Sequence, residues 1–438
     1  MKSIIKSIKT FNWRLWLVLA LTLFIPAIYT TTRIHFLGNL PGDYGVNIAS
    51  QLSRINLLYE IIHEAFILPL FYIFGNSLNS KNELENKTRT GLIVSTATYL
   101  LLSVLIIIFA RPLCEVMATD KSTLEETVNY IRLESIAITI GVISKFINVL
   151  FVTINKDKYM YIMLSIQTIV TIILDVFFVS ELPVSLKLGV NGIALTNIIV
   201  SSILVVLSFF LLKKEGINIF SSNKLSFSWM KEYGKIGVYS GLESFVRNIA
   251  FMIMISRLVN VISEQGNYWV ANNFIWTRLL LPATALYDVI KKETAESIEN
   301  IRNKTLGYII VSTIFCIAWF ASIPLWRLFL HYVLNVSDID TVIYIVLIQS
   351  AFYVFYIFNC IFDGTIYGRG KTKYMLVQSL FTNGIYYTLM FTLYKTGVWT
   401  PTLTTISLMF GIGMAIDLLP TIGCYFQVLK VSVKKSAS

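Results

Sequence analysis

The sequence predicts an all-α integral membrane protein with twelve transmembrane helices in two pseudo-symmetric six-helix bundles. Three observations predict this fold class: the composition, the number of apolar spans and a repeated sequence phrase. Of 438 residues, 55% are hydrophobic and only 14% are charged. Soluble domains carry roughly a quarter charged residues. This chain therefore cannot cover itself with a water-wet surface, and we expect it in a lipid bilayer.

The apolar spans account for nearly the whole chain. A helix needs about 20 apolar residues to cross the hydrocarbon core, and twelve segments meet this need: 14–37, 55–75, 91–112, 133–154, 159–180, 190–212, 236–259, 268–290, 306–330, 342–366, 374–394 and 402–429. The first span follows basic residues, as a signal peptide does. Its length and the eleven spans after it predict a retained helix instead.

A repeated phrase divides the spans into two sets of six. Lys-x-Lys-Tyr-Met at 156–160 returns at 371–375, and Leu-Pro at 68–69 returns at 281–282. Matches in the same order at similar displacements indicate a duplicated unit. Because six is an even number, both copies enter the membrane from the same side, as a parallel repeat does. We expect an N-terminal lobe over 1–212, a cytoplasmic connector over 213–235 and a C-terminal lobe over 236–438.

Basic residues predict the orientation of the chain. Segments on the side of the N-terminus hold 24 Lys or Arg, and segments on the opposite side hold seven. The positive-inside rule then places both termini in the cytoplasm of a multi-pass protein of the cell membrane. The connector carries Phe220, Phe227 and Trp229. It is either an amphipathic segment along the membrane surface or a tether whose aromatic rings reach the headgroups.

Composition and motifs exclude several functions. The net charge of +11 is spread over short segments between spans, which is typical of membrane topology and predicts no nucleic-acid partner. The four cysteines lie far apart, so neither a disulfide framework nor a metal site is expected. The sequence has no phosphate-binding loop and no nucleophile elbow or Cys/His triad. We expect a protein that is not an enzyme and has no cofactor.

Ionisable residues inside the spans are the candidates for function, because a charge at mid-bilayer costs on the order of 3 kcal/mol. The deepest are Glu60, His63, Glu64, Lys145, Asp175, Glu243, Arg247 and Arg278. Others lie nearer the span ends, where snorkelling to the interface is the alternative explanation; they are Arg33, Glu134, Asp288, Arg327, Asp363 and Asp417.

Two arginines occupy matching places. Arg33 and Arg247 stand 214 residues apart, within the range of displacements of the repeat. If the duplication holds, each lies on the first helix of its half, and the two guanidinium groups face one another across a pathway. The alternative is a pair of arginines that reach headgroups independently.

Asp175 and Thr171 lie one helical turn apart on the same face. Their carboxylate and hydroxyl could converge on a cation or a proton. The alternative is a static ion pair between Asp175 and an arginine such as Arg33.

Glu60, His63 and Glu64 share a second helix face, because their offsets are three and four residues. A proton-sensitive polar face is the first interpretation. Packing against an arginine or Lys145 is the second. A metal site is the weakest, since the carboxylate bundles need the motif twice.

Three local sequences stand out: Lys187-Leu-Gly-Val-Asn-Gly-Ile-Ala-Leu-Thr196, the stretch 172–179 around Asp175, and the segment 365–373. They resemble the multidrug and toxic compound extrusion (MATE) family, within the wider superfamily that includes lipid-linked oligosaccharide flippases. The first is similar to the opening of that family's sixth helix and the second to its fifth helix. The third is similar to its tenth-to-eleventh-helix loop, with Lys371 in place of an Asp. The resemblance covers nearly the whole chain and implies a V-shaped pair of lobes.

The resemblance also implies site residues. One branch of the family binds a cation or proton with a first-helix Asp, an Asn and an Asp on the fifth helix and a sixth-helix Thr. Here Asp175 and Thr196 match, Thr171 stands at the Asn place and Arg33 at the first-helix Asp place. The other branch uses a Glu on helix seven and an Asp on helix ten.

In that second branch, the corresponding places hold approximately Arg247 and Tyr356, with Glu243 one turn from Arg247. We therefore expect coupling at Asp175, Thr171, Thr196, Glu243, Glu60 and Glu64, and a substrate cavity lined by Arg33, Arg247, His63 and Tyr356. This chain departs from the family pattern in having Arg33 where the family has a first-helix Asp. Because Arg33 can act as a built-in counter-ion of Asp175, coupling through Asp175 is in doubt.

By this resemblance the chain is expected to be a secondary active antiporter that exports amphipathic small molecules, such as drugs or toxic compounds, by alternating access. The coupling ion is Na⁺ or H⁺, the partners are the substrate and the bilayer, and a monomer is expected. Paired arginines would favour anionic substrates. The alternative is therefore a flippase for a lipid-linked or anionic amphiphile. A membrane scaffold without transport is a third reading.

Overall fold

The computed structural model describes residues 11–38, 44–75, 77–78, 80–154, 156, 158–219, 224–369 and 371–436. Within these ranges the regular secondary structure is helical, and no strand occurs. The chain divides into two compact units. Unit 1 comprises the described residues up to Ile28 and from Ile253 onward, and unit 2 comprises those of Tyr29–Met252.

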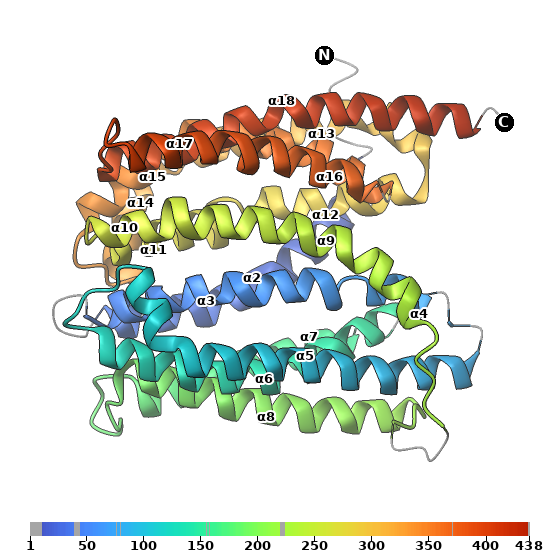
Figure 1. Ribbon diagram of the computed structural model, residues 1–438, viewed down its shortest axis with the longest axis horizontal. Coiled ribbons are helices and arrows are strands. Elements are labelled where there is room, and N and C mark those ends of the chain that lie inside the picture. The colour runs from blue at the N-terminus through green and yellow to red at the C-terminus, as the bar shows by residue number, and fades with distance from the viewer. Residues whose placement is uncertain are drawn as a thin grey trace. The chain divides into compact units, whose positions relative to one another are not determined.

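Unit 2 contains long helices that lie side by side (Figure 1). Helix α2 (Trp13–Leu37) enters it at Tyr29. The helices that follow are α3 (Tyr44–Phe66), α4 (Leu70–Gly75), α5 (Lys81–Val116), α6 (Leu124–Thr153), α7 (Lys158–Phe178), α8 (Gly189–Lys214) and α9 (Met230–Phe251).

Unit 1 continues the chain in longer rods, some of them broken by wide π-helical turns, which carry the label η. These elements are η2 (Met252–Ser256), whose first residue still belongs to unit 2, α10 (Arg257–Val261), α11 (Gln265–Phe274), η3 (Ile275–Leu279), α12 (Leu281–Glu296), α13 (Ile298–Ala321), α14 (Ile323–Leu328), η4 (Phe329–Val333), α15 (Ile339–Gly368), α16 (Thr372–Ser379), η5 (Leu380–Tyr386), α17 (Tyr387–Lys395) and α18 (Leu403–Ser436).

The twelve predicted spans correspond to these rods, so the all-α membrane fold is confirmed. In the described part of the chain, nine helices are long and apolar enough to cross a bilayer. The other three spans are α3, the rod α11–η3–α12 and the rod α16–η5–α17. Helix α3 carries Arg54, Glu60 and Glu64, and the other two rods contain the π-helical turns η3 and η5.

Several helices extend beyond their predicted spans because hydropathy marks only the apolar part of a helix. Helix α5 begins ten residues before the predicted 91, where Ser80 caps it by accepting a hydrogen bond from the amide of Glu83 at 3.4 Å. Asp338 caps α15 in the same way through the amide of Thr341 at 3.1 Å. A side-chain cap satisfies backbone donors in the polar first turn, so the helix starts outside the apolar stretch.

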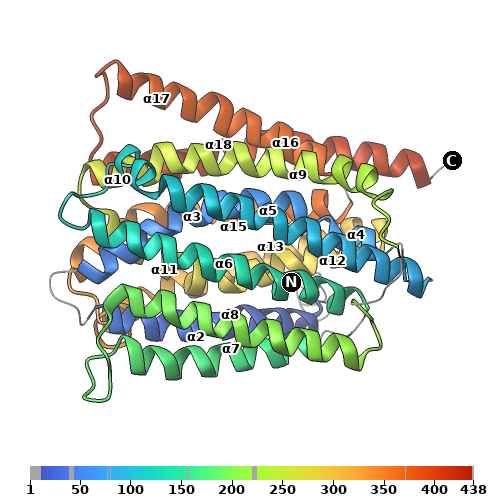
Figure 2. The same cartoon turned by 60° about the horizontal axis from the view of Figure 1, so that its bottom comes forward.

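Equivalent helices pack in the two halves of the sequence. Helix α6 packs against α5 and α8, and its counterpart α15 packs against α13 and α18. Helix α7 packs against α8 as α16 packs against α18, and the close run of α16 beside α18 is visible in Figure 2. Each pairing joins the same two spans of its half, which is the packing expected of a duplicated six-helix bundle.

The compact units do not end at the predicted connector. Helix α9 packs against α3 within unit 2. Within unit 1, the indole of Trp16 on α2 donates a hydrogen bond to the carbonyl of Pro282 at 3.0 Å. The first helix of each half thus packs partly on helices of the other half. The lobes 1–212 and 236–438 divide the chain according to its sequence repeat, not according to its compact units. The division into lobes stays a prediction.

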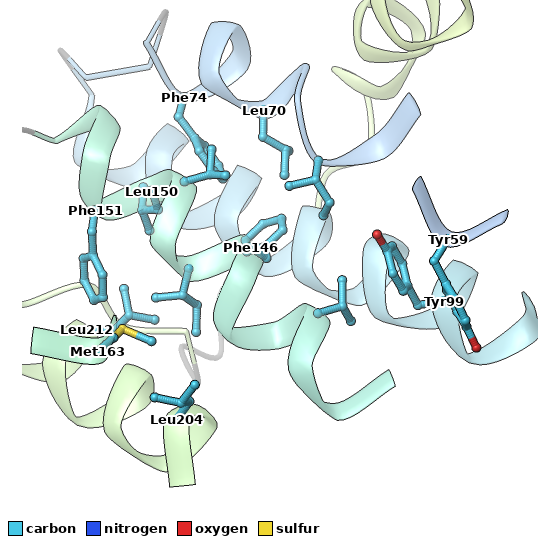
Figure 3. Close-up of a cluster of buried hydrophobic side chains, with 14 of the residues drawn as sticks. Tyr59, Leu70, Phe74, Tyr99, Phe146, Leu150, Phe151, Met163, Leu204 and Leu212 are labelled. Carbon is cyan, nitrogen blue, oxygen red and sulfur yellow. The ribbon is translucent and has the colours of Figure 1, made fainter. Parts of the chain in front are cut away.

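Aromatic residues form much of the core of unit 2 (Figure 3). Phe74 and Phe146 meet edge to face with ring centres 5.5 Å apart, and both are fully buried. Trp229 from the connector belongs to the same core and donates to the hydroxyl of Thr90 at 3.0 Å. This part of the connector is therefore fixed in protein, not in headgroups. Phe220 lies outside the described residues.

Candidate functional site

An ion pair joins α2 to α7 in unit 2. Nε of Arg33 donates to Oδ2 of Asp175 at 2.9 Å, and one terminal nitrogen donates to Oδ1 at 3.3 Å. Asp175 is 1% exposed. Two nitrogens on two oxygens fix the orientation of both groups. The guanidinium of Arg33 therefore stands beside the carboxylate where a bound cation would stand.

The ion pair continues into a polar network on α8 and α6. Arg33 also donates to Oδ1 of Asn197 at 3.1 Å, and the amide nitrogen of Asn197 donates to Oε1 of Glu134 at 2.7 Å. Tyr130 hydrogen-bonds the same carboxyl group. Glu134 is 2% exposed, so the alternative explanation of snorkelling to the interface does not apply to it. Asn197 thus links a guanidinium to a second carboxyl group.

The two threonines of the candidate coupling set lie in the same region of unit 2. Thr171 is buried one turn before Asp175 on α7, as the spacing predicted. Thr196 is adjacent to Asn197 on α8, is fully buried, and its hydroxyl oxygen has no hydrogen-bond partner among the described residues. Thr171 thus lies on the helix that carries Asp175, and Thr196 lies on α8, which packs against that helix.

A second charged group lies where α3 meets α9. Arg247 contacts Oε1 of Glu60 at 3.1 Å and Oε1 of Glu243, one turn earlier on α9, at 3.3 Å. Glu243 is buried, whereas the side chains of Arg247 and Glu60 are 40% and 44% exposed. Arg33 and Arg247 are thus each engaged by carboxylates of the same unit.

The rest of the predicted polar face lies nearby. The hydroxyl of Ser240 on α9 contacts Glu64 through its backbone carbonyl at 2.9 Å and its carboxylate at 3.3 Å. His63 on the same face has Lys145 of α6 as a charged neighbour. The side chain of Lys145 is exposed. Within the described residues, no cluster of three or more His, Cys, Asp or Glu can hold a metal ion.

Tyr356 lies apart from these groups, on α15 in unit 1. Its ring meets that of Trp276 at 5.1 Å and that of Tyr353 at 6.1 Å, both edge to face. Unit 1 holds Tyr356 in an aromatic cluster, whereas unit 2 holds every other residue of the expected coupling set and substrate cavity.

Sequence reasoning missed polar residues in both units. Asn197 follows the matched Thr196 directly, and its position inside a span was a usable signal. In unit 1, Asp363 and Asp417 were assigned to span ends. Asp417 in fact lies near the middle of α18, where Asn359, Gln378 and Thr382 hydrogen-bond it. Their contributions come from three helices, so no local pattern reveals the cluster.

Comparisons with known proteins agree with this architecture. Residues 19–177 match the MatE family model, and no curated protein matches the chain. A solved structure described as the inward-facing conformation of a multidrug resistance MATE family transporter of the MOP superfamily is similar over 94% of this chain and 96% of its own. It has a TM-score of 0.73 at 15% identity.

Two further solved structures have the same fold. One is the outward-facing conformation of a multidrug resistance MATE family transporter of the MOP superfamily, with a TM-score of 0.67, 15% identity and coverage of 97% of this chain and 96% of that one. The other is a MOP superfamily transporter from Pyrococcus furiosus Vc1 (DSM3638), with a TM-score of 0.70, 14% identity and coverage of 96% and 95%. Its description states that the reverse polarity of its binding pocket suggests a different function. The resemblance to the MATE family is confirmed.

Proposed function

We propose that the chain, whose residues 19–177 match the MatE family model and whose fold is that of MATE transporters, is a secondary active antiporter of that family. It exports amphipathic small molecules by alternating access, in exchange for Na⁺ or H⁺. The observation that carries the proposal is the exposure of Glu60 and Arg247. Both lie within membrane spans, yet their side chains are about two-fifths exposed. Charged side chains avoid acyl chains, so this face of unit 2 lines an aqueous opening.

Arg33 acts in this proposal as a resident cation. Its guanidinium holds both oxygens of Asp175, so the charge of this carboxylate is balanced without a transported ion. Coupling is then carried by carboxylates elsewhere, and Glu60, Glu64 and Glu243 are the candidates in unit 2. Each lies on α3 or α9, where a change in protonation would alter the contacts of Arg247 or Ser240.

The charge balance supports an organic cation or a neutral amphiphile as substrate. Both arginines are already engaged by carboxylates, so an anionic substrate would have to break an ion pair to reach either one. Aromatic residues make up 14% of the chain. Aromatic faces stabilise organic cations through cation–π contacts.

A flippase for a lipid-linked or anionic amphiphile is the second candidate. The exposed Lys145 favours it, because it adds positive charge beside His63 and forms no ion pair with a carboxylate among the described residues. The Pyrococcus furiosus relative, whose pocket is described as having reverse polarity, supports keeping this candidate. Thermal stabilisation separates the two. Organic cations are expected to raise the Tm of an exporter, whereas polyprenyl-phosphate lipids are expected to raise that of a flippase.

Transport in proteoliposomes tests the main proposal. We expect uptake of a fluorescent organic cation driven by an imposed Na⁺ or pH gradient. We expect Glu243→Gln and Glu60→Gln to lose the response to the gradient. Asp340→Asn, at an exposed site on α15, is the control and should retain it.

Two results would contradict the proposal. Wild-type uptake that ignores both gradients would remove the antiport mechanism. Full gradient dependence in Glu243→Gln and Glu60→Gln, together with its loss in an Asp175→Asn variant that stays folded, would assign the coupling role to Asp175.

A further inference from the structure

A second cluster of polar side chains lies inside unit 1, beginning one turn after Tyr356 on α15. Asp363 and Asn359 come from α15, Gln378 from α16, Thr382 from η5 and Asp417 from α18. These helices pack against one another in the second half of the sequence. The cluster therefore joins three transmembrane rods at one point, and Asp417 sits near the middle of its helix.

The two carboxylates converge on the same donors. The amide nitrogen of Asn359 lies 2.9 Å from Oδ2 of Asp417 and 3.3 Å from Oδ2 of Asp363. The amide nitrogen of Gln378 lies 3.0 Å from the first of these oxygens and 3.5 Å from the second. Thr382 donates to Oδ1 of Asp417 at 2.7 Å. Two carboxylates that share two donor nitrogens must lie close together.

The amides themselves are only half satisfied. Asn359 is 3% exposed and Gln378 is 5% exposed, and the side-chain oxygen of each is buried with no hydrogen-bond partner among the described residues. A buried polar atom without a partner costs about 1–3 kcal/mol. Both amides turn their nitrogens to the carboxylates and leave their carbonyl oxygens unused beside them.

The ligand chemistry of this cluster is that of a hard cation. Carboxylate, amide carbonyl and hydroxyl oxygens are the groups that bind such ions. Only two of the side chains are acidic and the other three are neutral. The ligand set thus carries less charge than sites that concentrate carboxylates on a divalent ion. Thr382 also lies in a π-helical turn, a feature that is frequent at functional sites.

We propose that Asp363, Asp417, Asn359, Gln378 and Thr382 form a binding site for a monovalent cation of the size of Na⁺. The cation takes one or both carboxylates as ligands. The side-chain amides of Asn359 and Gln378 rotate about their last torsion so that their carbonyl oxygens, instead of their nitrogens, face the ion. This rotation makes the ion the partner of the two carbonyl oxygens and turns the two amide nitrogens away from the carboxylates, whose charge the ion then balances. Binding of the cation does not depend on the proposed antiport function. Only the further role of this cation as a coupling ion rests on that function.

Na⁺ binding to the purified full-length protein in detergent tests the site without transport. The Tm is measured at constant pH and ionic strength while choline chloride is replaced by NaCl, KCl or CaCl₂. We expect a saturable rise in Tm with NaCl that exceeds the rise with KCl or CaCl₂. Loss of groups that merely orient metal ligands weakens affinity about 10–100-fold. Asp417→Asn and Asp363→Asn are therefore expected to weaken Na⁺ binding at least tenfold.

Asp340→Asn is the matched control, since Asp340 lies on α15 with Asp363 but is exposed and paired with Arg327. It should keep the response to Na⁺. Asp363 is only half-buried, so its variant keeps the test open if Asp417→Asn does not fold. Elution of each variant at the position of the wild type on gel filtration establishes folding.

Several results would overturn the site. A rise in Tm that is equal for Na⁺, K⁺ and choline would be an effect of ionic strength. Saturation by Ca²⁺ alone would assign a divalent ion, and a response to pH with none to Na⁺ would assign a shared proton. Unchanged Na⁺ affinity in Asp363→Asn and Asp417→Asn would place the ion elsewhere. A different result separates the site from the proposed function. Na⁺ binding in a protein that shows no Na⁺-driven transport would contradict the antiport mechanism but would support the cation site.

Discussion

At the scale of single residues, the Arg33–Asp175 pair combines burial with two-point contact. The side chain of Asp175 is 1% exposed and that of Arg33 is 16% exposed, so water screens the pair little. Removal of one partner of a buried ion pair leaves a charge without compensation, which costs about 3–5 kcal/mol, whereas replacing both partners by apolar groups is often neutral. The pair therefore has a specific mutational signature.

We expect Asp175→Leu and Arg33→Leu each to destabilise the protein by about 3–5 kcal/mol. The double variant should recover most of that loss, because it leaves no uncompensated charge. Unfolding in detergent, followed by intrinsic fluorescence, measures the three values. Arg111→Leu serves as control, since Arg111 pairs with Glu125 in solvent and exposed pairs contribute about 0–1 kcal/mol. Additive losses in the double variant would show that the two side chains act independently.

At the scale of elements, the contact between α3 and α9 depends on glycine. A Cβ at Gly237 would overlap the carbonyl oxygen of Ala65, and a Cβ at Gly241 would lie 2.8 Å from the Cβ of Ala65. The hydroxyl of Tyr233 on α9 also donates to the carbonyl of Phe66. The two helices approach closely enough here that backbone meets backbone.

Gly237→Ala is expected to force α9 away from α3 and to destabilise unit 2 by about 1–3 kcal/mol, as overpacking does. Gly234→Ala is the matched control on the same helix, because nothing lies within 4 Å of a Cβ at Gly234. A disulfide between Glu64→Cys and Ser240→Cys reports the contact. Cross-linking should fall in the Gly237→Ala background and persist in the Gly234→Ala background, and equal yields in both would contradict the tight contact.

The sequence predicted the transmembrane rods better than the π-helical turns that interrupt them. Apolar length alone places the rods, because a bilayer demands about 20 such residues. The π-helical turns η3 and η5 have no comparable signal. They depend on how neighbouring rods pack, and they interrupt two of the three rods that fall short of the criteria for a span. The sequence analysis placed Asp417 near a span end and missed its polar cluster for a related reason, since its hydrogen-bond partners come from α15, α16 and η5.

At the scale of the whole molecule, the distribution of basic residues predicts that both termini face the cytoplasm. The four native cysteines are buried, so a single introduced cysteine can report its own side of the membrane. In intact cells, a membrane-impermeant thiol reagent should label Lys121→Cys and Lys187→Cys. It should label Lys81→Cys and Lys292→Cys only after permeabilisation. All four lysines are exposed, and the reverse pattern would invert the topology.

The fold and part of the site were accessible from sequence because membrane solvation acts on each residue locally. The repeat located Arg33 and Arg247, and the one-turn spacing located Thr171 beside Asp175. The hydrogen-bond partners of these residues could not be predicted from the sequence in the same way. Arg33 reaches Asp175 and Asn197 across 142 and 164 residues of chain. Only the packing of α6 and α7 on α8 brings Glu134 into the same network.

The tethered guanidinium of Arg33 has an electrical consequence. Moving one elementary charge through a potential of 100 mV involves about 2.3 kcal/mol, and a diffusible ion at this seat would contribute that work to every turnover. A charge fixed to α2 travels no farther than its side chain allows. Voltage dependence of turnover, if recorded, must therefore originate at another position in the protein.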